Sequence, residues 1–138
     1  MTPLGLSRML VLLSLFLITG CGADGARISG KVTLGGAAIP EGRIELLPPN
    51  GGPVIAGAPI LDGAFHLDGA SLPAAGKYRI AIWYPKKTGR KVVAGSPAPP
   101  NTMIDETVEA VPAKYNKQST LQREVKNGSN TLDFELEG

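Results

Sequence analysis

Short runs of alternating apolar and polar residues, separated by glycine and proline, recur between residues 27 and 137. Side chains of a β-strand point alternately to the two faces of a sheet, so this period of two predicts strands with one buried face. The chain holds 18 glycines and 12 prolines, and no long helical periodicity interrupts the pattern. We therefore expect an all-β sandwich or barrel of short strands joined by turns.

The pattern predicts about seven strands. They span 27–34, 43–47, 54–60, 64–67, 77–84, 120–126 and 131–137. Gly30 shares the apolar parity of the first strand, which suggests a bulge or a close backbone approach. Pro59 cannot donate a ladder hydrogen bond, so the third strand is expected at a sheet edge. Asp62-Gly63 indicates a tight hairpin turn, and NGSN at 127–130 is expected to join the last two strands.

A long segment, 85–117, separates the fifth and sixth expected strands and includes GSPAPPN. A loop of this length without regular structure is usually functional or disordered. Its basic cluster KKTGRK contains Lys86, Lys87, Arg90 and Lys91. We expect a solvated loop here, and the alternative is contact with an anionic polymer or a lipid headgroup.

The charge balance argues against a nucleic-acid partner. The chain has 14 basic and 12 acidic side chains, and Arg8 is the one charged residue among the first twenty. The remaining chain is therefore close to neutral and has no basic stripe of the kind that binds nucleic acid. Removing residues 1–20 leaves about 118 residues, enough for one domain with a real core.

Residues 1–20 have the three parts of a secretory signal peptide. Residues 1–8 carry one positive charge, 9–18 form an almost unbroken apolar run, and Thr19 and Gly20 are small. The run is shorter than the about 20 apolar residues that a membrane-spanning helix needs. We therefore expect an exported protein.

Cys21 is the single cysteine of the chain. A disulfide has no partner here, zinc needs three or four ligands while His66 is the one histidine, and a nucleophile needs an adjacent base. The sequence ITGC at 18–21 resembles the lipobox of bacterial lipoproteins. This resemblance implies cleavage before Cys21, acylation of its thiol and a membrane anchor. Gly22 lacks the aspartate that resembles an inner-membrane retention signal, which favours the outer membrane.

Four segments resemble the carboxypeptidase regulatory-like and transthyretin-like domains, including small bacterial lipoproteins that carry such a domain. They are ISGKVTLGGAAIPEGRIELLP at 28–48, DGAFHLDG at 62–69, LPAAGKYRIAIWYP at 72–85 and VPAKYNKQSTLQREVKNGSNTLDFEL at 111–136. The resemblance implies a seven-stranded Greek-key sandwich of the prealbumin-like kind over 27–138, after a signal peptide at 1–20 and a lipidated tether at 21–26. The transthyretin-like hydrolases use several histidines, so their activity is not implied for a chain with one.

Candidate site residues follow from strand parity. Trp83 lies opposite the apolar face of its strand, so it suits stacking on a sugar or a partner protein, unless the long segment folds back and covers it. Pro112, Tyr115 and Asn116 are expected to dock the end of that segment onto the sandwich, as structural residues. The pattern offers no catalytic residue, metal site or cofactor site.

These features predict a non-catalytic, lipid-anchored module of the cell envelope with an unidentified protein or polysaccharide partner. One alternative is an accessory subunit of an envelope transport or secretion assembly. Another is a hydrolase that uses Asp, Lys and Tyr residues of the segment 85–117.

Overall fold

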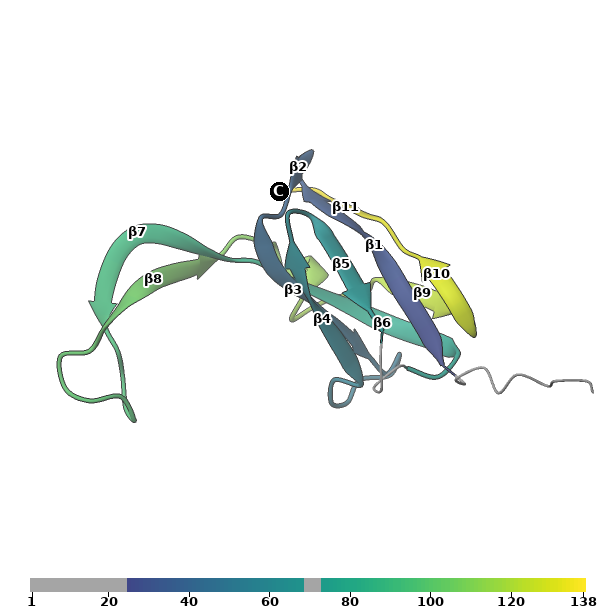
Figure 1. The fold of residues 1–138 in the computed structure, drawn as a ribbon, viewed down its shortest axis with the longest axis horizontal. Helices are drawn as coiled ribbons and strands as arrows, with labels where there is room; N and C mark the ends of the chain where they lie inside the picture. The colour runs from purple at the N-terminus through teal and green to yellow at the C-terminus, as the bar shows by residue number, and fades with distance from the viewer. Residues whose placement is uncertain (1–24, 69–72) are drawn as a thin grey trace, which may run out of the picture.

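The computed structural model describes residues 25–68 and 73–138, and the expected signal peptide and Cys21 lie outside them. Within these ranges the chain is all-β, with one short 3₁₀ helix and no α-helix (Figure 1). The elements are β1 (Ala26–Leu34), β2 (Ala37–Ala38), β3 (Glu41–Leu47), β4 (Ala56–Leu61), β5 (Ala64–Leu67), β6 (Gly76–Trp83), β7 (Pro85–Val93), β8 (Met103–Glu109), η1 (Ala113–Tyr115), β9 (Gln122–Val125), β10 (Gly128–Thr131) and β11 (Phe134–Leu136).

Nine strands form one strongly curled, mostly antiparallel sheet in the order β10-β1-β5-β4-β3-β6-β9, with β2 and β11 also paired to β1. The remaining two strands, β7 and β8, form a separate antiparallel ribbon that extends away from this body (Figure 1). The predicted all-β class is confirmed.

The concave face of the sheet holds the core. Ile44 pairs with Ile82 and Leu46 with Ile80 across β3 and β6, and all four side chains are buried. The alternation that predicted these strands is therefore the alternation between core and solvent. Burial of each such side chain contributes about 1.5–3 kcal/mol.

Two local predictions from glycine are confirmed. Asp62 and Gly63 both have positive φ, 51° and 77°, and connect the antiparallel strands β4 and β5. At Gly30 the backbone of Leu132 approaches so closely that a Cβ atom would lie 1.7 Å from its carbonyl oxygen. Leu132 lies in the connection between β10 and β11. Because both strands pair with β1, this connection passes close to the β1 backbone at Gly30.

The prediction that the strand with Pro59 lies at a sheet edge is wrong, since β4 lies between β3 and β5. Pro59 pairs with Arg43 of β3, but the pairing of β4 with β5 is limited to Ile60 and Leu61. Proline has no N–H to continue that second ladder. Strand β4 therefore has a neighbour on each side, but Pro59 itself is paired only with β3.

The predicted hairpin at the C-terminal end is also wrong. Residues 128–130 of the expected NGSN turn belong to strand β10, which pairs in parallel with Ala26–Ser29. The following strand β11 pairs in parallel with Val32–Leu34. The side chain of Asn130 bonds both backbone groups of Lys126. Its amide nitrogen donates to the Lys126 carbonyl oxygen at 2.7 Å, and its oxygen accepts from the Lys126 N–H at 2.9 Å.

The segment 85–117 is not a loop without regular structure. Residues 85–109 form the β7–β8 hairpin, and 113–115 form η1. GSPAPPN lies in the connection between β7 and β8, outside the strands, where its prolines are tolerated. No other strand within 25–68 and 73–138 covers either face of the ribbon, so its residues are almost all solvent-exposed. A segment without a buried face has no hydrophobic period by which the sequence could reveal it.

Candidate functional site

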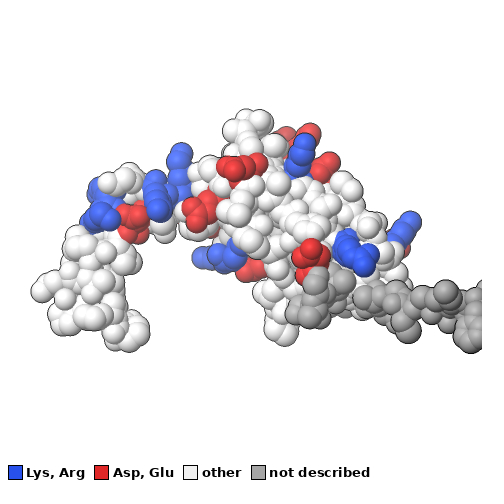
Figure 2. Space-filling model, viewed as in Figure 1, with Lys and Arg blue, Asp and Glu red and all other residues white. Residues whose placement is uncertain are grey.

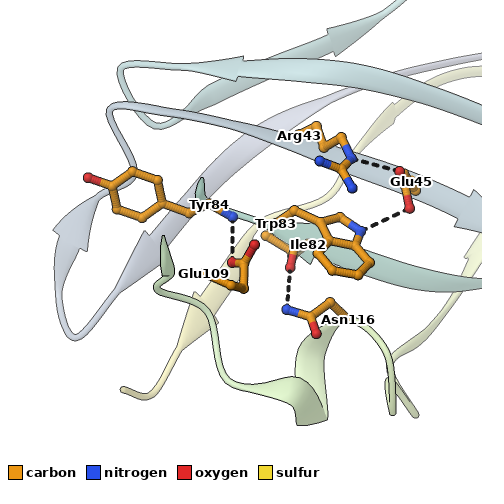
Figure 3. Close-up of polar contacts among 7 residues, drawn as sticks. All are labelled: Arg43, Glu45, Ile82, Trp83, Tyr84, Glu109 and Asn116. Atoms are coloured by element: carbon orange, nitrogen blue, oxygen red, sulfur yellow. Dashed lines mark hydrogen bonds and ion pairs between the residues drawn. The ribbon is translucent and has the colours of Figure 1, made fainter. Parts of the chain in front are cut away.

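Trp83 lies at the end of β6 on the outer face of the sheet, next to Arg43 of β3 in the strand register. The Arg43 guanidinium carbon lies 4.7 Å from the centre of the indole ring. Glu45 joins both side chains, because its carboxylate accepts from Trp83 Nε1 at 2.9 Å and from Arg43 Nε at 2.8 Å (Figure 3). The three residues, which we call the outer-face cluster, form a closed set of contacts.

These contacts fix the orientation of the indole before any ligand arrives. Trp83 is half-buried, and the cation over its ring comes from β3. The hairpin beginning at Pro85 leads away from the body instead of folding back over the cluster (Figure 1). A cation stacked on an aromatic face contributes about 0.5–1 kcal/mol at an exposed site, so the arrangement is only moderately stable and a ligand could displace Arg43.

A groove of about 260 Å³ lies beside the cluster, between the outer face of β3 and the base of the hairpin. It is lined by Glu41, Gly42, Arg43, Pro85, Lys87 and Thr107. Pockets for drug-sized ligands have volumes of about 300–1,000 Å³. The groove therefore has room for one sugar ring or one side chain of a partner.

The basic cluster of the sequence is solvent-exposed as expected, but it lies on strand β7 and not in a loop. Lys87 and Lys91 both reach Asp105, at 3.1 and 2.9 Å, and Arg90 reaches Glu106 at 2.8 Å. Lys86 makes no ion pair among the described residues. The two β8 carboxylates, Asp105 and Glu106, thus neutralise part of the positive charge that the sequence suggested, because the hairpin brings the two strands together.

The shared carboxylate of Asp105 is held in its charged form. Hydrogen bonds from Lys91 and then from Lys87 lower the pKa of the Asp105 carboxyl, and the same contact raises the pKa of Lys87. A lowered folded-state pKa means that any stabilisation by this carboxylate is present at neutral pH. It is lost only when the pH falls through the folded-state pKa, below the usual range of an aspartate.

Removing one of the two lysines is expected to raise the pKa of Asp105. In Lys87→Ala one hydrogen bond and one nearby charge disappear, so the carboxyl should titrate at higher pH. The control Lys86→Ala removes a charge from the same strand without contact to Asp105 and should leave the pKa unchanged. Carboxyl carbon shifts followed by NMR as a function of pH would measure both variants, and equal values would contradict the pairing.

The free edge of β6 beyond β9 is closed by side chains. Asn116 Nδ2 donates to the carbonyl oxygens of Ile82 at 3.3 Å and Val111 at 3.1 Å, and Ser119 Oγ donates to the carbonyl oxygen of Ile80. Asn116 and Ser119 are buried. Two polar side chains therefore take the place of a neighbouring strand at this edge.

The other residues expected at this dock lie around η1. Pro112 precedes the helix as its N-cap residue with φ −54°, and Tyr115 ends it. The half-buried Tyr115 packs against the core, and its hydroxyl accepts from the Glu137 N–H at 3.1 Å. The segment after the hairpin is thus attached to the body through η1 and Asn116.

Three residues of this region were not singled out from the sequence. Arg43 and Glu45 have the outward parity of their strand, but only the register of β3 against β6 brings them to Trp83. Glu109 fixes the hairpin to the body, because its carboxylate accepts from the Tyr84 N–H at 2.7 Å (Figure 3). The same carboxylate accepts from the Val111 N–H at 3.0 Å. Strand register between distant segments gives no local sequence signal.

Among residues 25–68 and 73–138, no group of three or more His, Cys, Asp or Glu residues could hold a metal ion. None of the helices in these ranges is long and apolar enough to cross a membrane. Comparison with protein-family models and with curated proteins gave no match.

Proposed function

We propose that the chain is a non-catalytic, lipid-anchored binding module of the cell envelope with a Greek-key, transthyretin-like β-sandwich domain. The resemblance of residues 18–21 to a lipobox supports the anchor through Cys21, with the outer membrane favoured. The outer-face cluster and its groove are the proposed binding site. The ligand is a protein or polysaccharide of the envelope.

The observation that carries the binding role is the fixed indole of Trp83 beside a small groove whose lining includes charged side chains. Aromatic rings that are held in place lose little conformational entropy when a ligand stacks on them. Charged groups of both signs, Glu41, Arg43 and Lys87, surround the groove and can hydrogen-bond hydroxyl or peptide groups. This combination suits a sugar residue or a polar peptide segment.

The alternative of a hydrolase in the segment 85–117 has less support from the geometry. Its Asp105 and Lys87 form an exposed ion pair, with pKa values moved away from neutrality in opposite directions. A general acid or base works best with a pKa near the working pH. The Tyr115 hydroxyl is occupied by a backbone N–H of the C-terminal strand region.

Labelling and crosslinking of the tagged full-length chain in cells would test the proposal. We expect radioactive palmitate to label the wild-type protein and its envelope fraction to retain it. Cys21→Ala should lose the label and accumulate as an uncleaved precursor. A labelled Cys21→Ala protein, or an unlabelled wild type, would contradict the anchor.

The same crosslinked material tests the binding site. Trp83→Ala is expected to lose most of the crosslinked partner, whereas Leu61→Ala, an exposed apolar residue on β4, should retain it. A reproducible protein that crosslinks to the wild type and is lost in Trp83→Ala would favour the accessory-subunit form of the proposal. Glycan that is recovered with the wild type in place of a protein would favour polysaccharide binding. Identical crosslinking of both variants would exclude Trp83 as a recognition residue.

A further inference from the structure

The far end of the β7–β8 hairpin is an exposed apolar surface, which we call the hairpin tip and define as residues 92–104. None of these thirteen residues is Asp, Glu, Lys or Arg. Four large apolar side chains of the tip are exposed, namely Val92 at 37%, Val93 at 60%, Met103 at 52% and Ile104 at 47%. Figure 2 shows this end of the hairpin without charge and the charged side chains gathered nearer the body.

Part of the polar backbone of the hairpin tip is already hydrogen-bonded or lacks a donor. Pro97, Pro99 and Pro100 carry no N–H. The N–H groups of Ala94, Ala98 and Thr102 donate to carbonyl oxygens within the tip, at 2.7, 3.1 and 3.2 Å. Entry of backbone into lipid is costly mainly because its N–H and C=O groups lose water. The tip has already met part of that requirement.

The charges behind the hairpin tip leave a positive excess. Lys87 and Lys91 share the single carboxylate of Asp105, and Lys86 makes no ion pair among the described residues. Glu109 is directed to backbone N–H groups at the base of the hairpin, away from the tip. Lysine and arginine stems lie along apolar surface while their charged ends reach polar headgroups.

Two other features lie on the same side of the molecule as the hairpin tip. In Figure 1 the tip, the connection between β3 and β4 and the start of β1 all lie at the lower side of the view. Val54 and Ile55 of that connection are exposed at 48% and 49%. Strand β1 begins at this side, and the proposed anchor Cys21 precedes it in the sequence. In this view the tip, this connection and the start of β1 therefore face the same way.

We propose that the hairpin tip inserts into the headgroup region of an anionic lipid bilayer, as a second membrane contact that orients the anchored domain. Apolar side chains of an interfacial element enter the headgroup and acyl boundary by about 5–10 Å, and basic residues beside them strengthen binding to anionic lipids. A second copy of the chain would also cover an apolar tip. The two lysines that share the single Asp105 carboxylate, and the place of the tip on the same side of the view as the start of β1, favour lipid.

Tryptophan placed in the hairpin tip would report insertion. The full-length chain, Met103→Trp and the matched control Ala37→Trp would be mixed with vesicles of equal parts phosphatidylcholine and phosphatidylglycerol, with and without brominated acyl chains. Ala37 is exposed on β2, on the opposite side of the view in Figure 1. The wild type supplies the background of Trp83, the one native tryptophan.

We expect the added Met103→Trp fluorescence to shift to shorter wavelength and to lose most of its intensity with brominated lipid, while the Ala37→Trp signal stays unchanged. Adding Val93→Glu and Ile104→Glu to Met103→Trp should abolish the quenching, since these exposed positions leave the core intact. High salt, or vesicles of phosphatidylcholine alone, should weaken it by screening or removing the opposite charge.

Three results would overturn the inference. The first is the absence of quenching at position 103, and the second is equal quenching at positions 103 and 37. The third is a concentration-dependent blue shift without vesicles, which would assign the tip to a second copy of the chain. The local readout separates this contact from the anchor, because loss of palmitate label in Cys21→Ala tests the anchor alone.

Discussion

Gly30→Ala is expected to abolish or nearly abolish stable folding. A Cβ atom at this position would lie 1.7 Å from the carbonyl oxygen of Leu132, 2.6 Å from its carbonyl carbon and 3.0 Å from Phe65 Cε1. The first two atoms belong to backbone, so no side-chain rotation can relieve the overlap. The Leu132 N–H also donates to the Ser29 carbonyl oxygen at 2.8 Å, which holds the crossing segment against β1.

The loss of stability in Gly30→Ala depends on which atoms must move to admit the new Cβ atom. Overpacking of a core by side chains costs about 1–3 kcal/mol, and displacing a backbone crossing should cost at least the upper end of that range. A domain of this size has about 5–15 kcal/mol of stability in total. We therefore expect the C-terminal strands β10 and β11 to detach or the whole sheet to unfold, because both depend on pairing with β1.

Urea denaturation followed by circular dichroism would measure the effect. The matched control is Gly95→Ala, where a Cβ atom would meet nothing within 4 Å, and its midpoint should stay close to that of the wild type. A Gly30→Ala protein with a wild-type midpoint would mean that the segment around Leu132 does not cross β1 as described.

The sheet could be predicted from the sequence where one face is buried. The runs around Ile44, Ile80 and Phe65 alternate between core and solvent, and their strands were placed within two residues of the observed bounds. Asp62-Gly63 and Gly30 were interpretable because each answers a backbone requirement that few residues meet. Local chemistry was sufficient in these cases.

The remaining features either lack a buried face or depend on contacts between distant segments. The hairpin strands β7 and β8 are solvent-exposed along their length, so hydrophobic period and burial could not reveal them. The parallel pairing of β10 with β1 joins residues about a hundred positions apart, such as Ala26 and Gly128. The contacts of Trp83 with Arg43 and Glu45 likewise required the register of β3 against β6.

The second large effect is expected for Asn116→Ala. This side chain is 5% exposed, and its amide nitrogen donates to the carbonyl oxygens of Ile82 and Val111. Its oxygen accepts from the Lys117 N–H at 2.7 Å. Each buried backbone group left without a partner costs about 1–3 kcal/mol, so we expect a loss of about 2–4 kcal/mol in the free energy of unfolding.

Asn116→Asp separates hydrogen bonding from packing, since it keeps nearly the same volume. The aspartate still accepts from Lys117 N–H, but its ionised oxygen would face the carbonyl oxygens of Ile82 and Val111. Burial and this repulsion should raise the folded-state pKa of the new carboxyl. The variant should therefore be least stable at neutral pH and regain stability as the pH falls through that raised pKa, when the protonated oxygen donates again.

Denaturant midpoints at neutral and at acidic pH would test both variants against Asn50→Ala, an exposed turn residue whose replacement should change stability by less than about 0.5 kcal/mol. Asn116→Ala should show no comparable recovery in acid relative to the wild type, because alanine does not titrate. A flat pH dependence of the Asn116→Asp deficit would contradict the donation to the β6 edge. Recovery of Asn116→Asp in acid would instead show that a proton donor at position 116 holds β6, the strand that carries Trp83, to the segment that follows the hairpin.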